Sequence, residues 1–288
     1  MTGADAVASL GMYDMPELQP ANDCLWQRIA EALRAAGMGG VPPALCRDRP
    51  LAEIWRDPRL LLAQACGAPY VTGLRGRVRL VGVPTYDAPG CGPGTYSSAI
   101  VVARRSALAR PEDLVGRRVA VNDLGSHSGA VAFRAWLAPL AAQGGDTVVS
   151  GVALTGSHRE SLRAVARGDA AAAAIDAATL ALLGDVAAGE VAGVRVIGWT
   201  GMAPALPYIT AAGRPGREVD IVRRALAEAV SDPQLAEVCR SLRLAGIAPA
   251  REEDYGRIER MMATGGRLGS WDGISTPAPA SGGQVSGS

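Results

Sequence analysis

A run of small polar residues, 122–129 (NDLGSHSG), follows one apolar stretch and precedes a segment of helical periodicity. The first backbone N–H groups of a helix have no partner within the helix, and the helix dipole is positive at that end. Ser126 and Ser128 add hydroxyl donors to these groups. His127 adds a ring donor, and Gly129 completes the turn. The run predicts an anion-binding turn, and an ordinary serine N-cap is the alternative.

The same pattern recurs at the next strand–helix junction, in residues 154–158 (LTGSH). Ser157 and His158 open the second helix, so each of the two histidines in the chain stands at the start of a helix that follows a strand. Neighbouring parallel strands end at the same edge of a sheet, which brings both turns to one cleft. This repetition favours a shared anion site. A serine–histidine hydrolase is disfavoured because neither GxSxG nor HExxH is present.

An acidic residue, Asp176, ends the next apolar stretch, 171–176. A carboxylate at the end of a strand that faces the same cleft can accept a hydrogen bond from a ligand, or it can orient one of the histidines. The alternative is that Asp176 only caps a helix over 177–185. Both roles remain open from the sequence.

Four of the six tyrosines fall in predicted loops of the first third of the chain. They are Tyr13, Tyr70, Tyr86 and Tyr96. A tyrosine at a loop tip suits the wall of a cleft, because its ring packs on a ligand and its hydroxyl hydrogen-bonds. We expect Tyr13, Tyr70 and Tyr96 to contact the ligand, and plain surface packing is the alternative.

The charged residues exclude several classes of protein. All 29 basic residues are arginine, so the chain has neither a Schiff-base lysine nor a GKS/GKT phosphate loop. With 28 acidic residues the net charge is +1, which offers no field to hold nucleic acid. No apolar run approaches the roughly 18 residues that a membrane-spanning helix needs. We expect no cofactor.

The five cysteines show neither CxxC nor histidine partners at metal-ligand spacing, so we expect no metal site. Their odd number and wide spacing indicate mostly free thiols in a reducing compartment. Cys66 and Cys91 both lie beside glycine in predicted loops, and a disulfide between them stays open.

These residues need a scaffold, and the sequence indicates one of the α/β class with mostly parallel strands, because short apolar runs alternate with segments of helical periodicity. Strands are expected at 6–12, 60–67, 78–84, 97–105, 117–122, 148–154, 171–176, 194–200 and 207–212. Helices are expected at 22–37, 111–116, 128–141, 158–168, 177–185, 217–230, 233–244 and 252–264.

The order of the elements predicts two lobes with a ligand cleft between them. Residues 1–102 and 208–274 would form a discontinuous first lobe, and 103–207 an inserted second lobe. Two paired crossing strands, 97–105 and 207–212, would join the lobes. The Pro/Ser/Gly-rich segment 275–288 is expected to be a disordered tail.

The assembled motifs resemble those of the phosphate/phosphite/phosphonate-binding proteins of ABC transporters, which have the type II periplasmic-binding fold. The matching stretches are ASLGMYD, CGAPYVT, RVRLVGVPTYDAPGC, YSSAIVVARR, LVGRRVAVND with SHSG, TGSHRESLRAVARGDAAAAAID and LPYITA, which together cover most of residues 7–245. The resemblance implies a small anionic ligand, an ABC permease as partner, and a monomer. It also implies phosphonate contacts from Ser126, His127, Ser128, His158, Tyr13, Tyr70 and Asp176.

The chain departs from the family pattern at two places; the first weakens the case for an amine-bearing phosphonate, and the second keeps an alternative function open. Aminophosphonate binders carry a further acid after an Ile-Pro-type turn, whereas this chain reads LPYI at 206–209. The first residues, MTGADAVASLGMYD, lack the pattern of an export signal, which suggests a cytoplasmic location as written and a periplasmic one only if a signal precedes them. The alternative function is a cytosolic enzyme on the same fold, acting on a small anionic metabolite with the histidines and Asp176 as acid/base groups.

Overall fold

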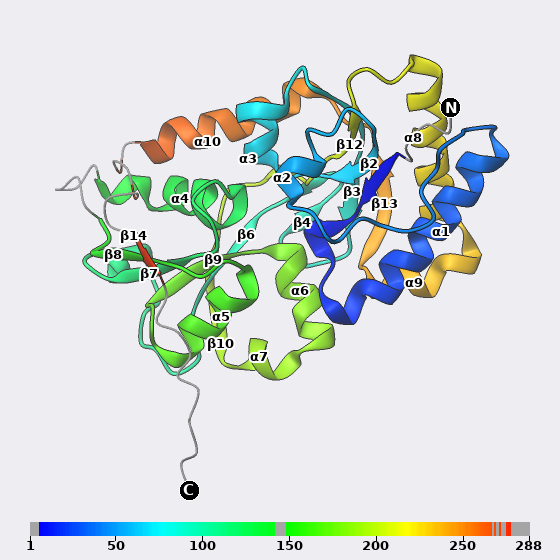
Figure 1. The fold of residues 1–288 in the computed structure, drawn as a ribbon. Helices are drawn as coiled ribbons and strands as arrows, with labels where there is room; N and C mark the ends of the chain where they lie inside the picture. The colour runs from blue at the N-terminus through cyan, green and yellow to red at the C-terminus, as the bar shows by residue number, and fades with distance from the viewer. Residues whose placement is uncertain (1–5, 142–147, 267, 269–270, 272–274, 278–288) are drawn as a thin grey trace, which may run out of the picture.

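The computed structural model describes residues 6–141, 148–266, 268, 271 and 275–277. Two large β-sheets lie side by side, each with its own helices, and a third small sheet lies where the chain passes between them. Figure 1 shows these two halves, and we call them the first lobe and the second lobe. The architecture is that of a two-lobed α/β protein, as the sequence predicts.

The first lobe is built on a five-stranded sheet in the order β1-β2-β12-β3-β13. Its strands are β1 (Val7–Ser9), β2 (Leu60–Gln64), β3 (Val78–Tyr86), β12 (Tyr208–Ala211) and β13 (Leu244–Ala248). Its helices are α1 (Gln19–Ala35), α2 (Leu51–Ile54), α3 (Gly67–Pro69), α8 (Gly216–Ser231), α9 (Ala236–Ser241) and α10 (Gly256–Gly266). Helix α1 forms because Leu25, Ile29 and Leu33 recur every fourth residue, and this stripe is buried in the core.

The second lobe is built on a six-stranded sheet in the order β10-β6-β9-β7-β8-β14. Its strands are β6 (Ser98–Ala103), β7 (Arg118–Val121), β8 (Gly151–Leu154), β9 (Ala172–Asp176), β10 (Val194–Trp199) and β14 (Ser275–Pro277). Its helices are α4 (Ala132–Ala141), α5 (His158–Arg167), α6 (Ala177–Val186) and α7 (Ala188–Ala192). Strand β7 is parallel to both β8 and β9, so the carboxyl ends of these three strands meet at one edge.

The alanine-rich strand β9 shows how this sheet is packed. Ala172 and Ala174 belong to one apolar core of the lobe, and Ala173 and Ile175 belong to another. Successive residues of a strand point to opposite faces, so both faces of β9 are covered. The strand ends at Asp176, the first polar side chain after this buried run.

The chain passes between the lobes through the small sheet β11-β5-β4. Its strands are β4 (Cys91–Gly92), β5 (Thr95–Tyr96) and β11 (Ala203–Pro204), and β5 pairs with β11 in antiparallel fashion. The expectation that 97–105 and 207–212 pair with each other is therefore wrong. Strand β6 pairs instead with β9 and β10, so a lobe boundary at 102/103 falls inside a strand of the second lobe.

Two helices contribute to the contact between the lobes. Helix α6 buries Ala178 and Leu182 in the core of the first lobe and Leu183 in a core of the second. Helix α10 of the first lobe packs on α4 of the second, and a side chain at Gly265 would come within 2.9 Å of Arg134 Cβ. The lobes are thus held together by helix packing as well as by the crossing strands.

Two further expectations change. Residues 275–277 form β14, which pairs in parallel with β8, so the predicted disordered tail does not begin at 275; residues 278–288 lie outside the described part of the chain. Cys66 and Cys91 do not form a disulfide, since both are free. Within the described ranges no helix has the length and apolar character needed to cross a membrane.

Candidate functional site

The polar turn after β7 forms the first half of the site. Residues His127–Val131 make a π-helical turn that runs directly into α4, and Ser126 is its N-cap. The Ser126 hydroxyl accepts a hydrogen bond from the Gly129 N–H at 3.2 Å. Ser126 and Ser128 are both buried, and their Oγ atoms lie 3.4 Å apart. The turn therefore holds two hydroxyls side by side at the start of a helix.

Position 129 requires glycine, because neighbouring side chains already fill the space that a Cβ atom would occupy. A Cβ atom at Gly129 would stand 1.8 Å from Asn122 Oδ1 and 3.3 Å from Cε1 of the His158 ring. Asn122 Oδ1 is itself buried and has no hydrogen-bond partner among the described residues. Any side chain at position 129 would push Asn122 or His158 out of place.

The turn after β8 forms the second half. The Ser157 hydroxyl caps α5 by accepting from the Glu160 N–H at 3.1 Å. His158 Nε2 lies 2.8 Å from Ser128 Oγ, so the two turns are hydrogen-bonded to each other. Burial lowers the pKa of His158 to about 4, and the backbone of Ala174 only partly offsets that effect. The ring is therefore neutral at pH 7.

Asp176 ends β9 and has two roles at once. Its Oδ1 accepts from the Thr179 N–H at 2.8 Å and caps α6, and its Oδ2 accepts from the Tyr13 hydroxyl at 3.0 Å. Burial raises the pKa of this carboxyl to about 6, although hydrogen bonds from Thr179 and Tyr13 work in the other direction. The contact with Tyr13 joins the first lobe to the second.

These groups line one cavity of about 320 Å³ between the lobes. Of the predicted residues it is lined by Tyr13, Ser126, Ser128, Ser157, His158 and Asp176. The other residues on its wall are Gly11, Met12, Met15, Leu51, Cys66, Asn122, Gly156, Arg159, Thr179 and Leu206. The cavity thus combines hydroxyls and a helix start with one carboxylate and several apolar side chains.

Comparisons with known proteins identify the family of the chain and its fold. Residues 59–255 match the family model described as ABC transporter, phosphonate, periplasmic substrate-binding protein. The chain belongs to this family. No curated protein matches the chain in sequence.

Solved structures with the same fold include members of this family. A phosphonate transporter binding protein from Pseudomonas aeruginosa superposes with a TM-score of 0.72 at 14% identity, covering 93% of this chain and 88% of that one. A Prochlorococcus marinus protein in complex with methylphosphonate gives 0.68 at 12% identity, with 91% and 97% covered. A Xanthomonas citri protein bound to chloride gives 0.69 at 15% identity, with 92% and 98% covered.

Four of the residues that were predicted to bind the ligand do not line the cavity: Gly129, His127, Tyr70 and Tyr96. Gly129 lies behind the wall, and His127 is buried with its ring 5.9 Å from that of Tyr96. Tyr70 packs on Tyr255 at 4.7 Å inside the first lobe. Among the described residues, the hydroxyls of Tyr70 and Tyr96 and the Nδ1 atom of His127 have no hydrogen-bond partner.

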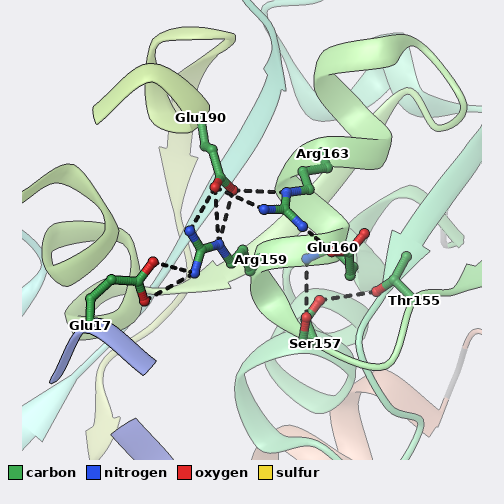
Figure 2. A network of polar contacts seen from close by, with 7 residues as sticks. All are labelled: Glu17, Thr155, Ser157, Arg159, Glu160, Arg163 and Glu190. Carbon is green, nitrogen blue, oxygen red and sulfur yellow. Dashed lines mark hydrogen bonds and ion pairs between the residues drawn. The ribbon is translucent and has the colours of Figure 1, made fainter. Parts of the chain in front are cut away.

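Arg159 is a cavity residue that the sequence reasoning missed. Figure 2 shows its guanidinium between two carboxylates. It donates to Glu190 of the second lobe at 2.7 Å and to Glu17 of the first lobe at 2.9 Å. A second pair across the lobes joins Arg243 to Asp185 at 2.6 Å. The Arg159–Glu17 and Arg243–Asp185 contacts each join the two lobes, and we call them the interlobe ion pairs.

Several other wall residues were also missed. Asn122 stood inside the polar run of the first turn, so its position was a usable signal. Met12, Met15 and Leu206 are apolar and carry no local mark of a site, so only the fold reveals them. No group of three or more His, Cys, Asp or Glu side chains that could hold a metal ion occurs among the described residues.

Proposed function

We propose that the cavity between the lobes binds a small phosphonate- or phosphate-like oxyanion, and that the protein delivers it to an ABC permease. The observation that supports this most directly is the pair of buried hydroxyls, Ser126 and Ser128, at a helix start on the cavity wall. Family membership supports the transport role. A location outside the cytoplasmic membrane and a monomeric state belong to the same proposal, and light scattering tests the latter.

The oxyanion is bound mostly by uncharged donors. The described wall offers the hydroxyls of Ser126 and Ser128 and the backbone at the start of the turn, and the neutral ring of His158 positions Ser128 through the hydrogen bond between Nε2 and Oγ. The one arginine on that wall, Arg159, is already engaged by Glu17 and Glu190. Charge-assisted hydrogen bonds to an anion, together with the helix dipole, hold such a ligand without a free cation.

Closure of the lobes completes the site in this proposal. Tyr13 of the first lobe contacts Asp176 of the second, so the wall is complete only when both lobes meet. A ligand that contacts both walls favours the closed form, and a permease can recognise that form.

The enzyme alternative has no support from these findings. The family is one of substrate-binding proteins, and burial lowers the pKa of both His127 and His158 to about 4. A general base is most effective with a pKa near the working pH. The two histidine rings do not meet that condition, whereas Asp176 does, with a pKa of about 6, so the argument against an enzyme rests on the family.

Isothermal titration calorimetry with phosphate, phosphite, phosphonates and small carboxylates tests the proposal. We expect at least one phosphonate or phosphate to bind and to raise the melting temperature, since a ligand at a hundred times its Kd adds roughly 2.7 kcal/mol of stability. Ser126→Ala should lower the affinity for that ligand. Ser241 is an exposed serine on α9, and Ser241→Ala is the matched control. Binding of carboxylates alone, or no loss in Ser126→Ala, would contradict it.

A further inference from the structure

Arginines gather at the end of the second-lobe sheet that faces away from the cavity. Strands β7 and β9 run toward the cavity in parallel, and β6 runs against them. The residues that follow β6 and precede β7 therefore lie at the far end of the sheet. This segment, 104–118, contains five arginines against two acidic residues, in a chain whose net charge is only +1. We call residues 104–118 the arginine pole.

Most of the arginines in the pole have no carboxylate partner. Four of the five are exposed and make no ion pair among the described residues, namely Arg104, Arg105, Arg110 and Arg117. The acidic Asp113 is used inside the segment, where it accepts from the N–H groups of Ala109 at 2.8 Å and Arg110 at 2.9 Å. The positive charge of the pole is thus largely uncompensated within the described part of the chain.

The pole also has a defined shape with an apolar tip. The wall of a hollow of about 530 Å³ includes Arg117, Ser106 and Leu108. Arg195 fixes this loop, since its Nη2 donates to the carbonyl oxygens of Ser106 and Leu108 at 2.9 and 2.5 Å. Val115 is 55% exposed, more than any other large hydrophobic side chain in the described ranges. An apolar side chain therefore projects among the guanidinium groups.

We propose that the arginine pole binds the surface of an anionic phospholipid bilayer, with its guanidinium groups on the lipid phosphates and Val115 in the headgroup layer. Two N–H groups of one guanidinium can donate to one phosphate, so arginine suits this contact better than a point charge does. Val115 favours a bilayer over a nucleic acid, because a bilayer offers an apolar layer beneath its phosphates. The inference goes beyond the proposed function, since the pole and the cavity lie at opposite ends of the sheet.

Binding of this kind is reversible. Each arginine near an anionic surface strengthens binding by roughly fivefold, and salt screens the attraction. Four exposed arginines hold the protein at the membrane for part of the time, without the permanence of an inserted helix. In this proposal the protein is concentrated beside the membrane that holds the permease, and its cavity stays open to ligand.

Co-sedimentation of the full chain with lipid vesicles tests the inference. One set of vesicles contains two parts of phosphatidylcholine to one of phosphatidylglycerol, and the other contains phosphatidylcholine alone. We expect the protein to sediment with the anionic vesicles only, and to be released when NaCl is raised from ~0.05 M to ~0.5 M. Equal sedimentation with both sets, or none with the anionic set at low salt, would overturn the inference and leave the proposed function standing.

The double variant Arg105→Gln/Arg117→Gln tests the location of the surface. We expect its partition onto the anionic vesicles to fall roughly twentyfold. Arg251→Gln/Arg260→Gln is the matched control, because both arginines are exposed, make no ion pair among the described residues and lie outside the pole. The control should change the partition by less than about twofold. Equal losses in the two double variants would mean that binding follows net charge, and the pole would not be the binding surface.

Val115→Ser distinguishes a bilayer from a soluble polyanion. We expect its partition onto the anionic vesicles to fall roughly three- to tenfold, because less apolar surface is removed from water. Retention on heparin, a soluble polyanion, should stay as in the wild type. If Val115→Ser left vesicle binding unchanged, the pole would recognise polyanions in general, and the proposal of a bilayer as its partner would be wrong.

Discussion

The two walls of the cavity are chemically unlike. The second lobe supplies small polar groups at strand–helix junctions, among them Ser126, Ser128 and His158. The first lobe supplies mostly apolar side chains, among them Met12 and Leu206. Polar groups with fixed positions suit the oxygens of an anion, and an apolar surface suits the substituent that distinguishes one ligand from another. If the cavity binds an oxyanion as proposed, we expect affinity to depend mainly on the second lobe and selectivity mainly on the first.

The walls meet where Tyr13 donates to Asp176. This contact places the one polar hydroxyl of the first wall against the one carboxylate of the second, within the described lining. Variants on each side of this contact therefore test whether the second lobe sets the affinity and the first lobe the selectivity.

Gly129→Ala should have the largest effect, because the added methyl group would stand 1.8 Å from Asn122 Oδ1. Overpacking of this kind destabilises a protein by roughly 1–3 kcal/mol, and displacement of Asn122 distorts the second-lobe wall. We expect ligand affinity to fall by more than about a hundredfold. Gly184→Ala, inside α6 with open space around it, should instead gain about 0.5–1 kcal/mol. Wild-type affinity in Gly129→Ala would show that the turn is not part of the site.

Ser128→Ala should come next, with a loss of roughly ten- to a hundredfold in ligand affinity measured by calorimetry. The change removes one donor and leaves His158 Nε2 without the partner it has at 2.8 Å, and an unpaired buried polar group costs about 1–3 kcal/mol. A first-lobe change of similar size, Met12→Leu, should alter the preference among phosphonates more than the affinity for phosphate. If Met12→Leu lowered the affinity for phosphate more than it altered the preference among phosphonates, the expected difference between the walls would be wrong.

Asp176→Asn should change how stability depends on pH in the absence of ligand. The pKa of Asp176 is raised from 3.8 to about 6, so its ionisation destabilises the folded state as pH rises from 4 to 7. We expect the stability of Asp176→Asn relative to wild type to improve by about 2–3 kcal/mol over that range. The lowered pKa values of His127 and His158 act in both proteins and cancel in this difference. Urea unfolding at both pH values measures it, and a constant difference would refute it.

Glu17→Gln should have the smallest effect, since it weakens one interlobe ion pair, the one that Glu17 makes with the cavity residue Arg159. Exposed ion pairs contribute little and are screened by salt, so we expect ligand affinity to fall about two- to fourfold at low salt and less at high salt. Glu160→Gln is the matched control, because Glu160 pairs with Arg163 inside the second lobe. Equal effects in both variants would mean that the pair does not act on closure.

The sequence predicted the second-lobe wall better than the first. Polar turns directly after apolar strands mark the positions of Ser126, Ser128, Ser157 and His158, because a local pattern fixes where a strand ends and a helix begins. For Asp176 the sequence left two readings open, and in the structure the side chain both caps α6 and lines the cavity.

The first-lobe wall depends on contacts between distant segments, which no local pattern records. Tyr70 was expected at a loop tip and lies in the core against Tyr255. Strand β13 was missed because 233–244 was expected to be one helix; the helix ends at Ser241, and Arg243 takes a left-handed conformation with φ of 50° before the strand. The prediction that the two crossing strands pair with each other was wrong for the same reason, since the register between segments a hundred residues apart is set by the fold.

Helix α6 has a thermodynamic consequence. Ala178 and Leu182 are fully buried against the first lobe, while Leu183 is buried in the second. If the lobes separate without ligand, as proposed, this apolar surface is exposed to water in the open form, and closure buries it again. Burial of apolar surface lowers the heat capacity, so the enthalpy of ligand binding should become more exothermic as temperature rises. The heat-capacity change should be larger in magnitude than the contacts of so small a ligand would produce.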